Sequence, residues 1–123
     1  MEQLASLFLH SRTQAHVFHL GVKGAGAFAA HTALQTYYTE LLEILDPLIE
    51  SYQGAYGLIE FQEVHGLETN CSIDAIVKYF DKLCEALDKL KEDKKLSASW
   101  IQNQIDNIAQ LLYTTKYKLV NLQ

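Results

Sequence analysis

Four stretches of the chain carry apolar residues at the spacing of an amphipathic helix. The first spans residues 4–22 and ends in the glycine-rich segment GVKGAG, which is typical of a turn. The second spans residues 28–52 and ends at Gly54. Its period continues for about 25 residues, so we expect it to be the longest helix.

The other two patterns lie in the second half of the chain. One begins after Ser72, a plausible N-cap, and covers residues 73–90 before the charged turn KEDKK. The last starts near Ser97 and continues to Leu122. Both patterns are close to heptad spacing, as the helices of a bundle require, so the sequence predicts an all-α chain.

A long connection separates the second pattern from the third. It reads GAYGLIEFQEVHGLETN, residues 54–70, and is much longer than the roughly two to eight residues that join antiparallel neighbours in a bundle. At about 1.5 Å per residue the second helix is near 37 Å long, and the connection can reach its far end. We therefore expect one domain over residues 1–123, a four-helix bundle with a long crossover between helices two and three, which is ferritin-like connectivity.

Composition narrows the classes of function. The 123 residues are 49% hydrophobic and 20% charged, an ordinary globular balance that argues against disorder. The formal net charge of −5 repels phosphate backbones and anionic membranes, which argues against DNA binding. No run approaches the roughly 18 to 20 apolar residues of a membrane span, and the start MEQLASLFLH lacks the basic region of a signal peptide. We expect a cytoplasmic protein.

Two histidines and two carboxylates are the candidates for chemistry. His19 and His31 border the apolar stripes of the first two helices, so each points inward or into an interface. Asp46 and Glu50, at i and i+4, share one helix face. Three simpler interpretations stay open: each histidine is a hydrogen-bonded core residue, both carboxylates face solvent, or Asp46 caps a new helical segment that starts at Pro47. A proline kink within one helix is more economical than such a short segment.

The spacing along the second helix restricts how these residues can cooperate. His31 and Asp46 are fifteen residues apart, which is about 22 Å along a helix axis, so one ion cannot touch both within one chain. A single site requires a two-fold dimer in which the second helices run antiparallel and each chain supplies half of the ligands. Nitrogen and carboxylate ligands with open positions suit redox iron, whereas the absence of cysteine from these four residues argues against a closed structural zinc site.

The segment His19-Leu20-Gly21-Val22-Lys23-Gly24, followed by Phe28 and His31 and then by Asp46 and Glu50, resembles the Dps-like mini-ferritins, the DNA-binding proteins from starved cells. In that family two histidines twelve residues apart face a D-x-x-x-E pair of the partner subunit, and together they bind iron for oxidation. The resemblance implies that His19, His31, Asp46 and Glu50 are metal ligands and catalytic residues. It implies oxidation of Fe(II), as non-haem iron, by peroxide or dioxygen, with iron storage in a dodecameric shell.

The sequence departs from the family pattern at four positions. Leu20 stands where the family has tryptophan, Gln35 where it has an acidic residue, and Ser51 where it commonly has arginine, while Pro47 is rare in this helix. Gln35 remains a candidate metal ligand through its carbonyl oxygen but brings no negative charge. No lysine-rich N-terminal extension is present, so DNA binding is not carried over. The alternative function is a non-enzymatic oligomerisation or structural protein.

The remaining histidines and aromatic residues are given ordinary structural roles. We interpret His10, His16 and His65 as surface or interface residues, because they do not match ligand positions of the family. Trp100 and the tyrosines are expected in the core or in subunit contacts. The chain has no nucleophile elbow and no P-loop, so hydrolase and nucleotide-binding functions lack support.

Overall fold

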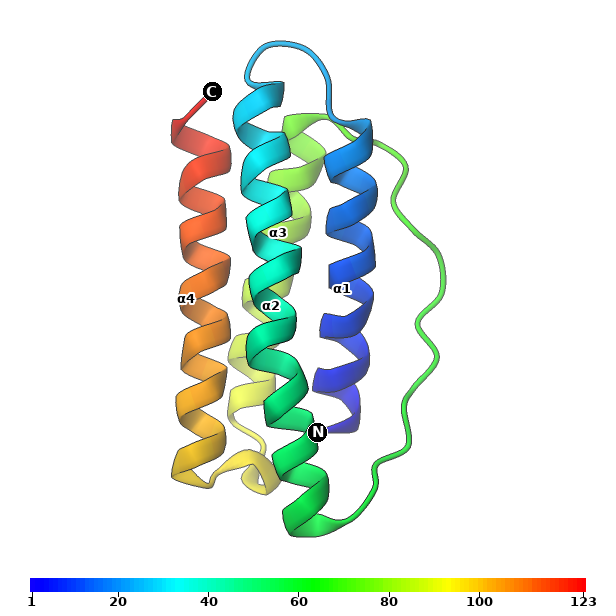
Figure 1. Ribbon diagram of the computed structural model, residues 1–123, viewed down its shortest axis with the longest axis vertical. Helices are drawn as coiled ribbons and strands as arrows, with labels where there is room; N and C mark the ends of the chain where they lie inside the picture. Colours follow the sequence, from blue (N-terminus) through cyan, green and yellow to red (C-terminus); the bar gives the residue numbers. More distant parts are fainter.

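The computed structural model describes all 123 residues and contains helices but no strands (Figure 1). This confirms the predicted all-α class with four long helices. None of these helices is both long enough and apolar enough to span a membrane. The elements are α1 (Glu2–Gly21), α2 (Ala27–Tyr56), α3 (Ile73–Lys91), the short 3-10 helix η1 (Lys94–Leu96) and α4 (Ser99–Asn121).

The four long helices form a bundle, and one long crossover determines the direction in which α3 runs relative to α2. Helices α1 and α2 are antiparallel neighbours, and α2 also packs against α4, which packs against α3. After α2 the chain returns along the outside of α1 over residues 57–72, so that α3 starts at the opposite end of the bundle (Figure 1). Helices α2 and α3 therefore run parallel, and the predicted crossover between helices two and three is present.

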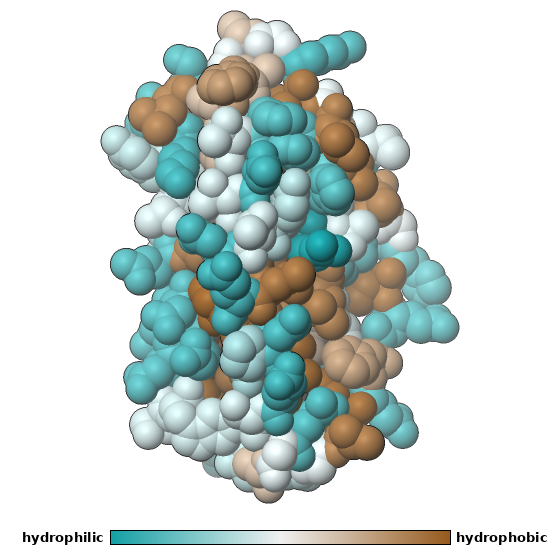
Figure 2. Space-filling view, viewed as in Figure 1, coloured by the Kyte–Doolittle hydropathy of each residue, from teal (hydrophilic) through white to brown (hydrophobic).

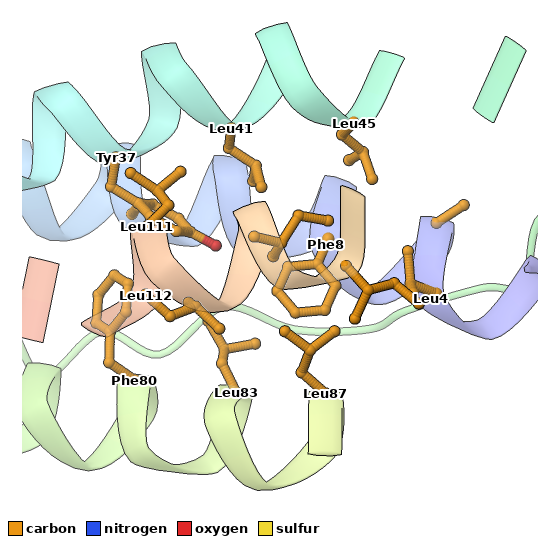
Figure 3. Packing of buried hydrophobic residues seen from close by; sticks show 14 of the residues in the cluster. Leu4, Phe8, Tyr37, Leu41, Leu45, Phe80, Leu83, Leu87, Leu111 and Leu112 are labelled. Carbon is orange, nitrogen blue, oxygen red and sulfur yellow. The ribbon is translucent and has the colours of Figure 1, made fainter. Parts of the chain in front are cut away.

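The apolar stripes of all four helices meet in one core of 27 buried hydrophobic residues (Figure 3). The rings of Tyr37 and Phe80 meet edge to face at 4.9 Å near one end of the region drawn. The Tyr37 hydroxyl is fully buried and bonds to Ser11 Oγ at 2.7 Å, and Ser11 Oγ donates to the Phe8 carbonyl. Burial raises the pKa of Tyr37 well above its usual range.

Helix α2 is longer than predicted. It continues through Pro47 and Gly54 and ends at Tyr56, followed by the C-cap Gly57, whose φ of +96° is a conformation that glycine adopts without strain. Ile49 and Tyr52 are buried in the core on this last part of the helix. Beyond the predicted end, the ring of Tyr56 packs on Tyr52 and stacks on Trp100. The helix is unbroken through Pro47, which rules out a separate segment capped by Asp46.

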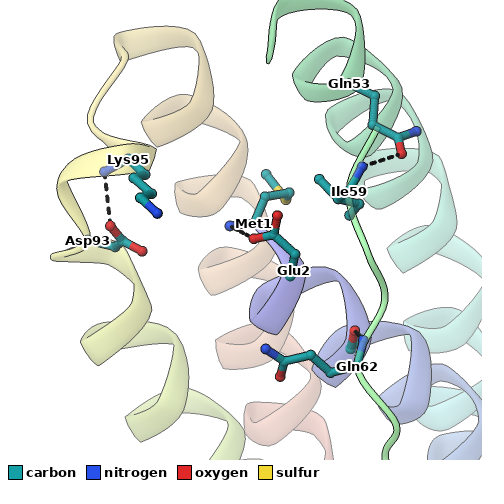
Figure 4. A network of polar contacts seen from close by, with 8 residues as sticks. Met1, Glu2, Gln53, Ile59, Gln62, Asp93 and Lys95 are labelled. Carbon is teal, nitrogen blue, oxygen red and sulfur yellow. Dashed lines mark hydrogen bonds and ion pairs between the residues drawn. The ribbon is translucent and has the colours of Figure 1, made fainter. Parts of the chain in front are cut away.

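Capping contacts define the other ends. Ser72 Oγ accepts a hydrogen bond from the Ala75 N–H, which confirms the predicted N-cap of α3. Helix α4 begins at Ser99 rather than near Ser97, because η1 occupies part of the charged turn. The Asp93 carboxylate caps η1 by accepting from the Lys95 N–H at 2.9 Å, and the Gln53 side chain accepts from the Ile59 N–H where the crossover leaves α2 (Figure 4).

A polar stripe on α1 holds the crossover against the bundle. Ser6, His10 and Gln14 are spaced four residues apart and so lie on one face of the helix. The Gln14 side-chain amide both donates to and accepts from the backbone of the crossover, as a strand neighbour would. The hydrogen bonds of this stripe join Ser6 to Gln62 (2.8 Å), His10 to Gly66 (2.6 Å) and Gln14 to Glu68 (2.7 and 2.9 Å).

Candidate functional site

The tight turn between α1 and α2 brings His19 and His31 face to face. His19 is the third-last residue of α1, and His31 lies in the second turn of α2. Their rings stack with centroids 3.6 Å apart and planes 22° apart. His19 Nδ1 lies 2.7 Å from the carbonyl oxygen of His31, and His31 Nδ1 lies 2.9 Å from the carbonyl oxygen of His19. The two residues that the sequence singled out therefore form a reciprocal pair.

The hydrogen bonds of this pair fix which nitrogen of each ring carries the proton. A carbonyl oxygen only accepts, so Nδ1 of each ring donates, and in the neutral imidazole Nε2 keeps its lone pair. Nε2 of each ring has no hydrogen-bond partner in the chain and reaches the surface. Metal-binding histidines show this pattern, because a backbone carbonyl or carboxylate holds one nitrogen while the other binds the ion.

Two further rings support the histidine pair. His16, one turn before His19, stacks on Tyr38 with centroids 4.7 Å apart. Tyr38 meets His19 edge to face at 5.5 Å, and the centroids of His16 and His19 are 5.9 Å apart. His16 is exposed, as predicted for a surface residue. Neither residue was predicted to belong to the site, although the spacing of three between His16 and His19 already places these two on one helix face.

Asp46 and Glu50 lie on the other half of α2, on its exposed surface. Neither makes an ion pair, and neither accepts a hydrogen bond from a side chain of the chain. Within one chain the carboxylates thus face solvent. Helix α2 contains no Lys or Arg, so its negative charge is not balanced on the helix; its acidic residues are Glu40, Glu43, Asp46 and Glu50.

Gln35 lies one turn after His31, on the exposed side of α2. It lines a shallow depression with Glu40 and three threonines, Thr32, Thr36 and Thr39.

Leu20 and Phe28 flank the histidine pair and are 72% and 84% exposed. Both apolar side chains are therefore accessible to another molecule at this end of the bundle.

A single chain does not assemble the four predicted ligands. No three histidine, cysteine, aspartate or glutamate side chains lie close enough to share an ion within one chain. The helical path from His31 to Asp46 is continuous, and about 22 Å separates them along its axis. Of the other histidines, His65 is exposed and pairs with Glu63, whereas His10 binds the crossover.

Comparison with known proteins identifies a family without a described function. A family model described as "Family of unknown function (DUF5856)" matches residues 24–119, which include His31, Gln35, Asp46 and Glu50 and leave out His19. Curated proteins and solved structures give no match. The family model covers most of the chain, so the chain belongs to the family of unknown function DUF5856.

Proposed function

We propose that this chain is a Dps-like iron-binding protein that oxidises Fe(II) with peroxide or dioxygen at a site shared between two subunits. The observation that carries the proposal is the His19–His31 pair, in which both Nδ1 atoms are engaged by backbone carbonyls and both Nε2 atoms are open. With Nδ1 of each ring held by a carbonyl, Nε2 is the nitrogen left to bind a transition-metal ion.

The chain path supports a ferritin-like bundle. The long crossover makes α2 and α3 parallel, which is the connectivity of ferritin-like folds and differs from a simple up-and-down bundle. In such bundles, metal sites are built from histidine and carboxylate side chains on facing helices. We propose a two-fold dimer as the smallest active unit, and a dodecameric shell that stores the ferric product as its larger assembly.

The four side chains would contribute two kinds of ligand to the metal site. His19 and His31 supply neutral nitrogen, and Asp46 and Glu50 of the partner subunit supply the negative charge that balances a divalent ion. Two Fe(II) ions each give one electron to a peroxide molecule, which takes up protons and is reduced to water. Gln35 offers only a neutral oxygen, so a second ion next to the first would be held more weakly.

The experiment is Fe(II) oxidation followed by the absorbance of the ferric product after addition of peroxide. We expect His31→Asn and Glu50→Gln to lower the initial rate at least about tenfold, because each removes a ligand of the shared site. His65→Gln and Glu85→Gln are matched controls on exposed positions away from the pair, and should oxidise iron at the native rate. Equal rates in all five proteins would contradict the proposal.

A second candidate is a non-enzymatic oligomerisation or structural protein on the same bundle. The exposed apolar side chains of Leu20 and Phe28 favour it, since they suit a subunit contact and contribute nothing to metal binding. This function predicts a stable oligomer in solution that oxidises Fe(II) no faster than buffer does. Both candidates fit a cytoplasmic protein, in which Cys71 and Cys84 stay as free thiols.

A further inference from the structure

The backbone of the crossover has two edges, and α1 binds one of them. Between residues 60 and 68 the backbone groups bonded to α1 all belong to even-numbered residues: the N–H of Gln62, the carbonyl of Gly66 and both groups of Glu68. In an extended strand the N–H and C=O of one residue point to the same side, and those of the next residue point to the opposite side. The polar stripe of α1 therefore takes the place of a neighbouring strand along the even-numbered edge.

The odd-numbered edge has no partner. The backbone groups of residues 61, 63, 65 and 67 make no hydrogen bond within the chain. Every residue from 60 to 70 is exposed, and the crossover is the outermost segment on its side of the bundle (Figure 1). A row of free N–H and C=O groups on an extended segment is a template on which another strand can pair.

Large apolar side chains accompany this free edge. Four of them recur at every third position of the crossover and are between 43% and 89% exposed: Leu58, Phe61, Val64 and Leu67. In the space-filling view, apolar side chains recur along the edge of the molecule that carries the crossover (Figure 2). A segment that pairs with the crossover would therefore bury apolar surface in addition to forming backbone hydrogen bonds.

The charge of this part of the molecule restricts what can pair with the free edge. Residues 24–77 contain no lysine or arginine, and the crossover contributes three glutamates to that stretch, Glu60, Glu63 and Glu68. None of them pairs with a lysine or arginine elsewhere in the chain, and Glu63 pairs only with His65. Two crossovers side by side would set glutamates against glutamates, and like charges on neighbouring strands are destabilising. The edge thus disfavours a second copy and favours a basic segment.

We propose that residues 61–67 pair with an extended segment of another protein that carries lysine or arginine among apolar residues. Backbone hydrogen bonds to the odd-numbered edge give affinity, while the glutamates and the exposed apolar side chains select the sequence of the segment. The bonds to α1 already hold the crossover extended, so it loses little conformational freedom on binding. This inference goes beyond the proposed function and does not depend on a metal.

Peptide binding with a residue-resolved readout tests the proposal. The probe is a fluorescein-labelled twelve-residue peptide of alternating valine and lysine; a peptide of alternating serine and lysine has the same charge without the apolar side chains. In fluorescence anisotropy we expect the valine–lysine peptide to bind at least about tenfold more tightly. By NMR, its binding should slow amide hydrogen exchange at Phe61, Glu63, His65 and Leu67, but not at Val64, whose N–H lies on the other edge.

Proline and alanine at one position separate backbone pairing from side-chain effects. His65→Pro removes one N–H of the free edge, whereas His65→Ala keeps it, and both lose the contact with Glu63. We expect His65→Pro to bind the valine–lysine peptide at least about tenfold more weakly than the native chain, and His65→Ala to bind it no more weakly. Glu60→Gln with Glu63→Gln should also weaken binding. Glu85→Gln with Asp88→Asn, an equal change of charge at exposed positions of α3, should not.

Three outcomes would overturn the proposal. Equal binding of both peptides without slower exchange at the odd-numbered amides would show only general attraction to an acidic protein. No binding, or equal binding by His65→Pro and His65→Ala, would exclude pairing at this edge. A concentration-dependent dimer in sedimentation that protects the same amides without peptide would assign the edge to a second copy. The exchange experiment uses the native chain, so it decides even where His65→Pro fails to fold.

Discussion

His19 and His31 each donate the Nδ1 proton to the backbone carbonyl of the other, across the turn that joins α1 to α2. The interaction is symmetrical, so it fixes both rings and also ties the end of α1 to the start of α2. Changing one residue to a side chain without a donor therefore leaves the carbonyl of the other residue without this hydrogen bond. The remaining ring keeps its own bond to the backbone but loses the ring stacked on it.

This arrangement predicts the tautomer of both histidines in the metal-free protein. In multiple-bond ¹H–¹⁵N spectra recorded where the rings are neutral, His19 and His31 should show protonated Nδ1 and unprotonated Nε2, because Nδ1 is held by a carbonyl. The exposed His65 has no such carbonyl and serves as the internal comparison. Protonated Nε2 in either member of the pair would contradict the hydrogen bonds and remove the open ligand.

Ser11 and Tyr37 should respond unequally to removal of their hydroxyl groups. Ser11→Ala leaves the fully buried Tyr37 hydroxyl without a partner and should lower the free energy of unfolding by about 1 to 3 kcal/mol. Tyr37→Phe leaves Ser11 bonded to Phe8, so its cost should be about 1 kcal/mol. Urea unfolding followed by the fluorescence of Trp100 measures both, and a larger loss for Tyr37→Phe would contradict this hydrogen-bond chain.

Gln14 should be the most sensitive residue of the stripe that holds the crossover. Gln14→Ala removes both hydrogen bonds to Glu68 and should destabilise the fold by about 1 to 3 kcal/mol, with faster amide exchange at Glu68. Thr13→Ala, at the neighbouring exposed position, is the matched control and should change stability by less than about 0.5 kcal/mol. Unchanged exchange at Glu68 would show that Gln14 does not hold the crossover.

The sequence predicted the helices well because their apolar period is long, but it misplaced ends that depend on tertiary packing. Gly54 looked like the end of the second helix by its local preference. The packing of the Tyr56 ring on Tyr52 and Trp100 favours continued helix as far as Tyr56. Likewise η1 lies within a charged turn, and the burial of Leu96 together with the Asp93 cap orders this part of the turn.

The histidine pair was partly predictable for a different reason. Two residues on either side of a short turn between antiparallel helices must lie close together, so His19 and His31 could be placed side by side from spacing alone. Their hydrogen bonds to backbone carbonyls, and the packing of Tyr38 on His16, depend on side-chain rotamers that no sequence pattern encodes. The position of the carboxylates relative to a partner depends on the quaternary arrangement, which a single chain does not contain.

The most direct test of a site shared between subunits is complementation between two inactive chains. One chain carries His19→Ala and His31→Ala, and the other carries Asp46→Asn and Glu50→Gln; each should fail to oxidise Fe(II) alone. After mixing and subunit exchange, half of the dimers are mixed, and each mixed dimer regains one intact site of two. The account predicts recovery of about a quarter of the native rate. No recovery, in a sample where mass spectrometry shows that mixed dimers have formed, would contradict it.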